Sequence, residues 1–161
     1  MDFIEPNEPL EPEYRLWRLM DYTARIINAA RSKALNKIGL SKETAGILSA
    51  VLRLHNNAMP IEIARYGLRK PQTTTSIINK MVKQGLLIKN VDKNKKNTFR
   101  ISLTERGKLA HQKMTSLKIY KKIISTVSEE QQNNLEKALN EIKNNAKKCV
   151  KSSTLEIDDS K

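Results

Sequence analysis

The chain has 161 residues, which suits one domain, or one domain extended by helices, and leaves little room for two independent cores. Its 30 Lys and Arg residues outnumber its 17 Asp and Glu residues, and the net charge of +13 favours a polyanionic partner, either nucleic acid or an acidic membrane surface. No apolar run approaches the roughly 20 residues of a membrane span, Cys149 has no second cysteine for an intramolecular disulfide, and the N-terminus lacks a secretory pattern, so we expect a cytoplasmic protein.

The positive charge is concentrated in the middle of the chain. Residues 63–91 include six basic residues and no acidic one, whereas residues 1–13 include five acidic residues and no basic one. Polar, charged chain ends are usually solvated. We therefore expect a flexible acidic N-terminus over residues 1–10 and a flexible tail over residues 150–161.

An amphipathic helix is the first predicted element. Apolar residues recur with helical spacing from Trp17 to Ala30, and Pro12 suits the first turn of such a helix. Gly39 interrupts the pattern. We assign residues 11–37 to this N-terminal helix.

A second and a third helix are expected next. Ser41 is suited to cap the second helix, and Asn56 and Asn57 end it. Pro60 opens the third helix, which is short, and Gly67 closes it.

The fourth helix begins at Pro71 and ends at Gly85. Its apolar residues Ile77, Ile78 and Met81 recur with helical spacing and are expected to face inward. The opposite face of this helix is therefore predicted to be polar and exposed.

A β-hairpin is predicted after the fourth helix, because the apolar period changes there. The strands are expected at 86–91 and 98–103, and the second strand alternates apolar with polar residues. The polar run at 92–97 would form a basic tip that contains asparagine.

Two further helices are expected within residues 108–149. Thr104 is suited to cap the first, whose apolar residues extend to Val127. Ser128 and Gln131, three residues apart, form the signature of a capping box for the second.

Two short helices joined by a tight turn and followed by a two-stranded ribbon constitute a winged helix-turn-helix. The sequence thus predicts a mainly helical fold class with a small β-hairpin wing, in which residues 41–107 form the DNA-binding lobe. The second helix of such a motif enters the DNA major groove.

The exposed face of the fourth helix has side chains suited to DNA. Gln and Asn pair bidentately with adenine, Ser and Thr bond to base edges or phosphates, and Lys neutralises phosphate. Thr74 is expected to be half-buried. The lysines of the hairpin tip are either DNA contacts or part of a solvated loop. The candidate DNA-contacting residues are Arg69, Lys70, Gln72, Thr73, Thr75, Ser76, Asn79, Lys80, Lys83, Lys93, Lys95 and Lys96.

Residues in several elements together form a recognisable pattern. They are Ile63 and Ala64 in the short helix, the run from Thr75 to Ile88, Asp92 in the wing, and the run Leu103-Thr104-Glu105-Arg106-Gly107 after it. With this pattern the segment 61–107 resembles the MarR family of bacterial and archaeal regulators, and the helix-rich flanks match the architecture of that family.

The wing departs from the pattern of the family. That pattern reads Asp, two residues, Asp and two basic residues, whereas the positions here are Asp92, Lys95, Lys96 and Asn97. The resemblance implies a minor-groove role for Lys96, with Lys95 beside it. The missing second Asp and second basic residue leave that role open.

The resemblance implies a homodimer in which the N-terminal helix and the two C-terminal helices of each subunit interlock. Such a dimer binds pseudo-palindromic double-stranded DNA with half-sites about 10 base pairs apart. The resemblance further implies transcriptional control, most often repression, and release from DNA by a small aromatic ligand in a crevice between the dimer helices and the DNA-binding lobe. Tyr14, Trp17 and Met20 are the candidate ligand contacts, although a place in the core or in the dimer interface is the more ordinary one for such residues.

Residues that would support other chemistry are few. His55 and His111 have no Cys or carboxylate at ligand spacing, so no metal site is expected. Cys149 is interpreted as a bystander thiol, with redox sensing as the alternative. No phosphate-binding glycine loop, nucleophile elbow or zinc-protease motif occurs, so no cofactor and no enzymatic activity are expected.

Two other functions fit the same features. A winged-helix module can bind a protein partner in place of DNA, and an architectural protein can use the same positive charge without reading sequence. Salt dependence and competition by random DNA would separate these alternatives from a sequence-specific regulator.

Overall fold

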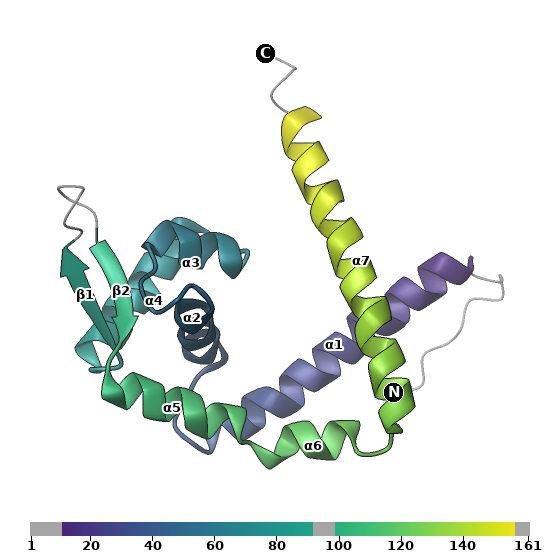
Figure 1. Cartoon of the computed structure of the whole chain (residues 1–161), viewed down its shortest axis with the longest axis horizontal. Coiled ribbons are helices and arrows are strands. Elements are labelled where there is room, and N and C mark those ends of the chain that lie inside the picture. The colour runs from purple at the N-terminus through teal and green to yellow at the C-terminus, as the bar shows by residue number, and fades with distance from the viewer. Residues whose placement is uncertain (1–10, 92–98, 157–161) are drawn as a thin grey trace. The chain divides into compact units, whose positions relative to one another are not determined.

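The computed structural model describes residues 11–91 and 99–156 of the chain (Figure 1). The chain divides after Ile119 into two compact units, and the first contains the helix-turn-helix and the wing. The elements in chain order are α1 (Pro12–Asn36), α2 (Lys42–Arg53), α3 (Pro60–Tyr66), α4 (Pro71–Lys83), β1 (Leu87–Val91), β2 (Phe99–Leu103), α5 (Glu105–Thr115), α6 (Lys118–Ile124) and α7 (Glu129–Glu156).

The structure confirms the predicted fold class, which is mainly helical with a single antiparallel hairpin in the described part of the chain. Leu87 of β1 lies opposite Leu103 of β2. Ala58, between α2 and α3, forms an antiparallel bridge with Ile101 of β2, and their two N–H···O distances are 3.1 and 2.8 Å. This bridge attaches the base of the wing to the helices.

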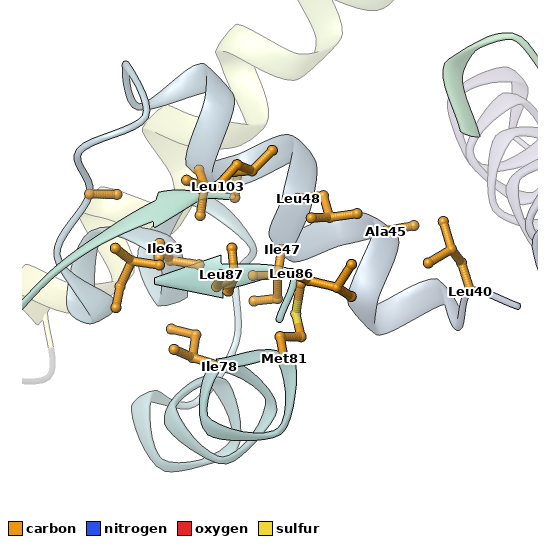
Figure 2. Packing of buried hydrophobic residues seen from close by; sticks show 14 of the residues in the cluster. Leu40, Ala45, Ile47, Leu48, Ile63, Ile78, Met81, Leu86, Leu87 and Leu103 are labelled. Atoms are coloured by element: carbon orange, nitrogen blue, oxygen red, sulfur yellow. The ribbon is translucent and has the colours of Figure 1, made fainter. Parts of the chain in front are cut away.

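The buried core of the first unit is built around α2. This helix contacts α1, α3, α4, α5 and β2, and its Ile47 and Leu48 are fully buried. Figure 2 shows Ile78 and Met81 of α4 pointing from below toward the start of the hairpin, where Leu87 is buried. Because the core fixes this side of α4, the opposite side of the helix faces outward.

The predicted helix caps are confirmed. The hydroxyl oxygen of Ser41 accepts from the N–H of Thr44 at 3.1 Å. The hydroxyl oxygen of Thr104 accepts from the N–H of Gly107 at 3.0 Å. At the start of α7, the N–H of Ser128 donates to the side chain of Gln131 at 2.9 Å, and the reciprocal bond is 3.3 Å long.

The helix expected after the wing is two helices, so the prediction of one continuous helix was wrong. α5 ends at Thr115 and α6 begins at Lys118. The Thr115 hydroxyl donates to the carbonyls of His111 and Gln112 at 3.2 and 3.0 Å, and the Ser116 hydroxyl donates to its own helix in the same way. These side chains offer the backbone carbonyls an alternative to helical N–H partners, which weakens the helix at this point.

The last helix is longer than predicted. α7 continues to Glu156, whereas the flexible tail was expected to begin at residue 150. No Gly or Pro follows Ser128 in the sequence, so no residue of the kind that breaks a helix lies near residue 150. The N-terminal segment 1–10 and the residues after Glu156 lie outside the described residues.

Gly67 closes α3, as predicted, because the helix ends at Tyr66 and Gly67 is its C-cap. The left-handed conformation, however, is adopted by Leu68 and not by Gly67, with φ 48°. The N–H groups of Leu68 and Arg69 donate to the carbonyls of Arg65 and Ala64 at 3.2 and 3.0 Å, which is the Schellman pattern. The Leu68 side chain is 86% exposed, so little burial compensates for the backbone strain.

Replacing Leu68 with glycine is expected to raise the free energy of unfolding by about 1 kcal/mol. The left-handed backbone costs a branched residue roughly 1–2 kcal/mol, and the greater entropy that glycine gives the unfolded chain offsets only part of that gain. Leu68→Ala removes the same exposed side chain but keeps the strain, so it serves as the control. Urea unfolding of both variants measures the difference. Equal midpoints for the two variants would contradict this explanation.

Candidate nucleic-acid interface

α4 has one buried face and one exposed face. Ile78 and Met81 are fully buried, and Thr74 is fully buried as well, not half-buried as expected. Side chains spaced four, three and four residues apart form the exposed face, here called the outward stripe. The outward stripe consists of Gln72, Ser76, Asn79 and Lys83. The candidate residues that flank the stripe are Thr73, Thr75 and Lys80, and all are exposed.

Ser76 is oriented by its own helix. Its hydroxyl donates to the backbone carbonyl of Gln72 at 3.1 Å. The hydrogen of the hydroxyl is therefore used within α4, and the oxygen lone pairs remain as acceptors. Ser76 is thus suited to accept a hydrogen bond from an amino group, such as those of adenine and cytosine in the major groove.

The N-terminus of α4 is positively polarised. Lys70 occupies the N-cap position, Pro71 begins the helix, and the first turn contains no acidic residue. Since no described side chain caps this end, its backbone N–H groups are open to an external acceptor. Together with the exposed Lys70 ammonium, this end of the helix is suited to a phosphate.

Arg69 does not project freely from the surface. A methyl group on Gly46 of α2 would lie 3.0 Å from one guanidinium nitrogen of Arg69, and a methyl group on Gly67 would lie 3.3 Å from the other. The pKa of the nearby Glu43 is lowered, mainly by a backbone hydrogen bond and to a smaller extent by Arg69. The Arg69 guanidinium therefore packs against Gly46 of α2 and Gly67 of the turn, and the DNA contact predicted for Arg69 stays a prediction.

Lys89 of β1 joins the wing to α4. Its Nζ donates to Oδ1 of Asn79 at 2.5 Å and lies 5.5 Å from the centre of the Phe99 ring. Sequence reasoning did not single out Lys89. Strand alternation was a usable signal, because it places Lys89 on the same face of β1 as the buried Leu87.

The base of the wing is held by two further contacts. The side-chain oxygen of Asn56 accepts from the N–H of Leu103 at 2.7 Å. Arg100 of β2 donates to the carbonyl of Asn57 at 3.4 Å and lies 3.9 Å from the carboxylate of Glu62. These contacts hold the hairpin beside α4 (Figure 1). The predicted DNA-contacting residues of the hairpin tip, Lys93, Lys95 and Lys96, lie outside the described residues.

The candidate ligand residues lie on α1. Tyr14 and Trp17 stack with ring centres 5.7 Å apart and an interplanar angle of 15°. They are 50% and 55% exposed, and Met20 is partly buried, so none of the three belongs to the buried core of this chain. Other large apolar residues of α1 are also exposed, namely Leu16, Leu19, Tyr22, Ile26 and Ile27.

The remaining titratable candidates are dispersed. His111 is partly buried, and burial lowers its pKa, while His55 and Cys149 are exposed. Among the described residues, no group of three or more His, Cys, Asp or Glu side chains is placed to hold a metal ion. None of the described helices has the length and apolar character needed to cross a membrane.

No family model and no curated protein matches the chain. Solved structures do match. The organohalide-sensing transcriptional regulator RdhR, crystallised with 2,4-dichlorophenol, is 29% identical, with a TM-score of 0.74 over 89% of this chain and 87% of that one. A mutant of the MarR protein of E. coli, in complex with operator DNA, is 16% identical, with a TM-score of 0.72 over 84% of this chain and 99% of that one.

A MarR-family transcriptional regulator from Rhodococcus is 15% identical, with a TM-score of 0.73 over 83% of this chain and 96% of that one. These similarities cover more than four-fifths of this chain, well beyond the segment that carried the sequence resemblance. The outward stripe of α4 and the hairpin held by Asn56 and Arg100 agree with this similarity. The chain therefore has the winged-helix fold of the MarR-family regulators that it resembles.

Proposed function

We propose that the protein is a sequence-specific, double-stranded DNA-binding transcriptional repressor that acts in the cytoplasm as a homodimer and leaves DNA when a small aromatic ligand binds. The outward stripe of α4 carries the proposal. Its Gln, Ser, Asn and Lys side chains are exposed on one face, opposite fully buried Thr74, Ile78 and Met81. Such side chains bond to base edges or neutralise phosphates.

The charge around the stripe supports a DNA partner. Residues 63–91, which contain α4 and β1, have six basic and no acidic residues. The uncapped N-terminus of α4 adds a positive dipole end beside Lys70. A surface of this kind attracts duplex DNA through phosphate neutralisation, and the amide and hydroxyl groups of the stripe then supply selectivity.

Exposed apolar faces support the homodimer. α1 has Leu16, Trp17 and Ile26 exposed, each by more than half of its surface. α7 separately has Leu135, Leu139, Ile142 and Val150 exposed at helical spacing. Large contiguous apolar surfaces of this kind usually mark a protein interface. A two-fold dimer would cover these faces and would present two copies of α4 to a pseudo-palindromic operator.

Release from DNA by a ligand is supported by the aromatic pair on α1 and by the ligand with which RdhR was crystallised. Tyr14 and Trp17 form a stacked, half-exposed aromatic surface beside Met20. RdhR, at 29% identity, was crystallised with a chlorinated phenol. We propose the same class of ligand for this chain, and a regulatory role in place of an enzymatic one.

A competition titration tests the proposal. The duplex that the protein selects most strongly from fragments of its own genome is titrated at physiological salt, with a random duplex of equal length as competitor. We expect a preference of about a thousandfold and a saturating ratio of two chains per duplex. Equal affinity for both duplexes would instead indicate architectural binding, and no binding to either would favour a protein-interaction module.

A further inference from the structure

The contact between Lys89 and Asn79 fixes the orientation of a side chain in the outward stripe. Lys89 is half-buried and held by two groups, the Asn79 amide at 2.5 Å and the Phe99 ring at 5.5 Å. An ammonium group has donors and no acceptor, so it can bond only to the oxygen of the amide. The NH₂ group of Asn79 is therefore the end of the amide that faces away from Lys89.

This orientation changes what Asn79 offers to a base. The common pairing of asparagine with adenine is bidentate: the amide oxygen accepts from N6 and the NH₂ donates to N7. Here the oxygen already accepts from a cation. A second lone pair remains on that oxygen, but an adenine amino group placed there would bring its own partial positive charge close to the Lys89 ammonium.

Guanine has the complementary chemistry. Its major-groove edge presents two acceptors, N7 and O6, and no donor. An NH₂ group beside an ammonium group is a purely donating, positively charged surface, which attracts such an edge. Resting on the proposed function, we infer that Lys89 is a specificity-determining residue, which turns Asn79 from an adenine reader into a reader of guanine.

The experiment measures base preference and not affinity alone. Each position of one operator half-site is replaced in turn by the four base pairs, and the dissociation constant is measured at fixed salt for the full-length protein. We expect one position at which the wild-type protein prefers guanine to adenine. Lys89→Met keeps an unbranched side chain of nearly the same length but frees the amide oxygen, and it is expected to shift the ratio at that position toward adenine by about tenfold.

Two further variants make the result specific. Lys80→Met removes one positive charge from the flank of the stripe, so it is expected to weaken all duplexes alike and to leave the ratio unchanged. Asn79→Ala removes the reading group, so Lys89→Met in that background is expected to produce no shift. A shift that persists without Asn79, or a Lys89→Met variant that behaves like Lys80→Met, overturns the inference alone. A wild-type protein that binds operator and random duplex equally overturns the proposed function as well.

Discussion

Gly107→Ala is expected to destabilise the protein by about 3 kcal/mol, at the upper end of the usual cost of overpacking. A methyl group at this position would lie 2.1 Å from the carbonyl oxygen of Leu86 and 3.3 Å from Cγ of Leu103. The first contact is with backbone, and that carbonyl also accepts from the N–H of Thr104 at 3.2 Å. Neither the new methyl group nor the Leu86 carbonyl can move away without disturbing the packing between α4, the wing and α5.

Gly46→Ala is the matched control for Gly107→Ala, because both replacements add one methyl group to a glycine within a helix. The three atoms nearest to the new methyl group in α2 would all belong to the guanidinium end of Arg69, which can shift more easily than backbone. Removing a glycine from a helix interior gains about 1 kcal/mol. Urea unfolding at one protein concentration should give a much lower midpoint for Gly107→Ala and an equal or higher midpoint for Gly46→Ala. A wild-type midpoint for Gly107→Ala would contradict the close approach to Leu86.

The sequence predicted the order and type of the elements because their signals are local. Ser41, Thr104 and Ser128 cap helices through bonds to residues three positions away, and each cap was found where expected. The inward side of α4 also followed from periodicity, since Ile78 and Met81 are both buried. Capping and periodicity thus account for the winged helix-turn-helix architecture.

The differences between the predicted and the observed fold arise where Gly and Pro do not mark the change. The break between α5 and α6 occurs without Gly or Pro, where the hydroxyls of Thr115 and Ser116 bond to backbone carbonyls. The left-handed residue after α3 is Leu68, although a glycine immediately precedes it. Here the geometry of the turn into α4 decides which residue takes the strained conformation, and intrinsic preference does not.

The site was only partly predictable, because its geometry depends on contacts between distant residues. Periodicity identified the outward stripe, but it treated Asn79 as a free amide and Arg69 as a free cation. Asn79 is bonded to Lys89, ten residues away, and Arg69 packs over Gly46, more than twenty residues away. Side-chain type predicts what a residue can bind, whereas the partner that it already has requires the tertiary structure.

Changes to Gln72 and Ser76 are expected to alter sequence preference, each reducing discrimination at its own operator position by about tenfold to a hundredfold. Gln72 can pair with adenine through both the oxygen and the NH₂ group of its amide. The Ser76 oxygen can accept a hydrogen bond from a base, since the hydroxyl hydrogen is bonded within α4. Alanine at either position removes base contacts and leaves the charge of the surface unchanged. The loss should therefore be largest on the preferred operator and small on random duplex.

Lys80→Ala is the contrasting variant, because its expected target is a phosphate. It should weaken binding to every duplex alike and reduce the slope of log affinity against log salt by about 0.9. Titrations of all three variants against base-substituted operators at several salt concentrations separate the two classes of contact. If Gln72→Ala and Ser76→Ala weakened all duplexes equally, or left binding unchanged, α4 would not be the element that reads the operator. If only Lys80→Ala changes the affinity, the protein contacts only the phosphates of the DNA. Its sequence preference then has to come from the shape of the duplex.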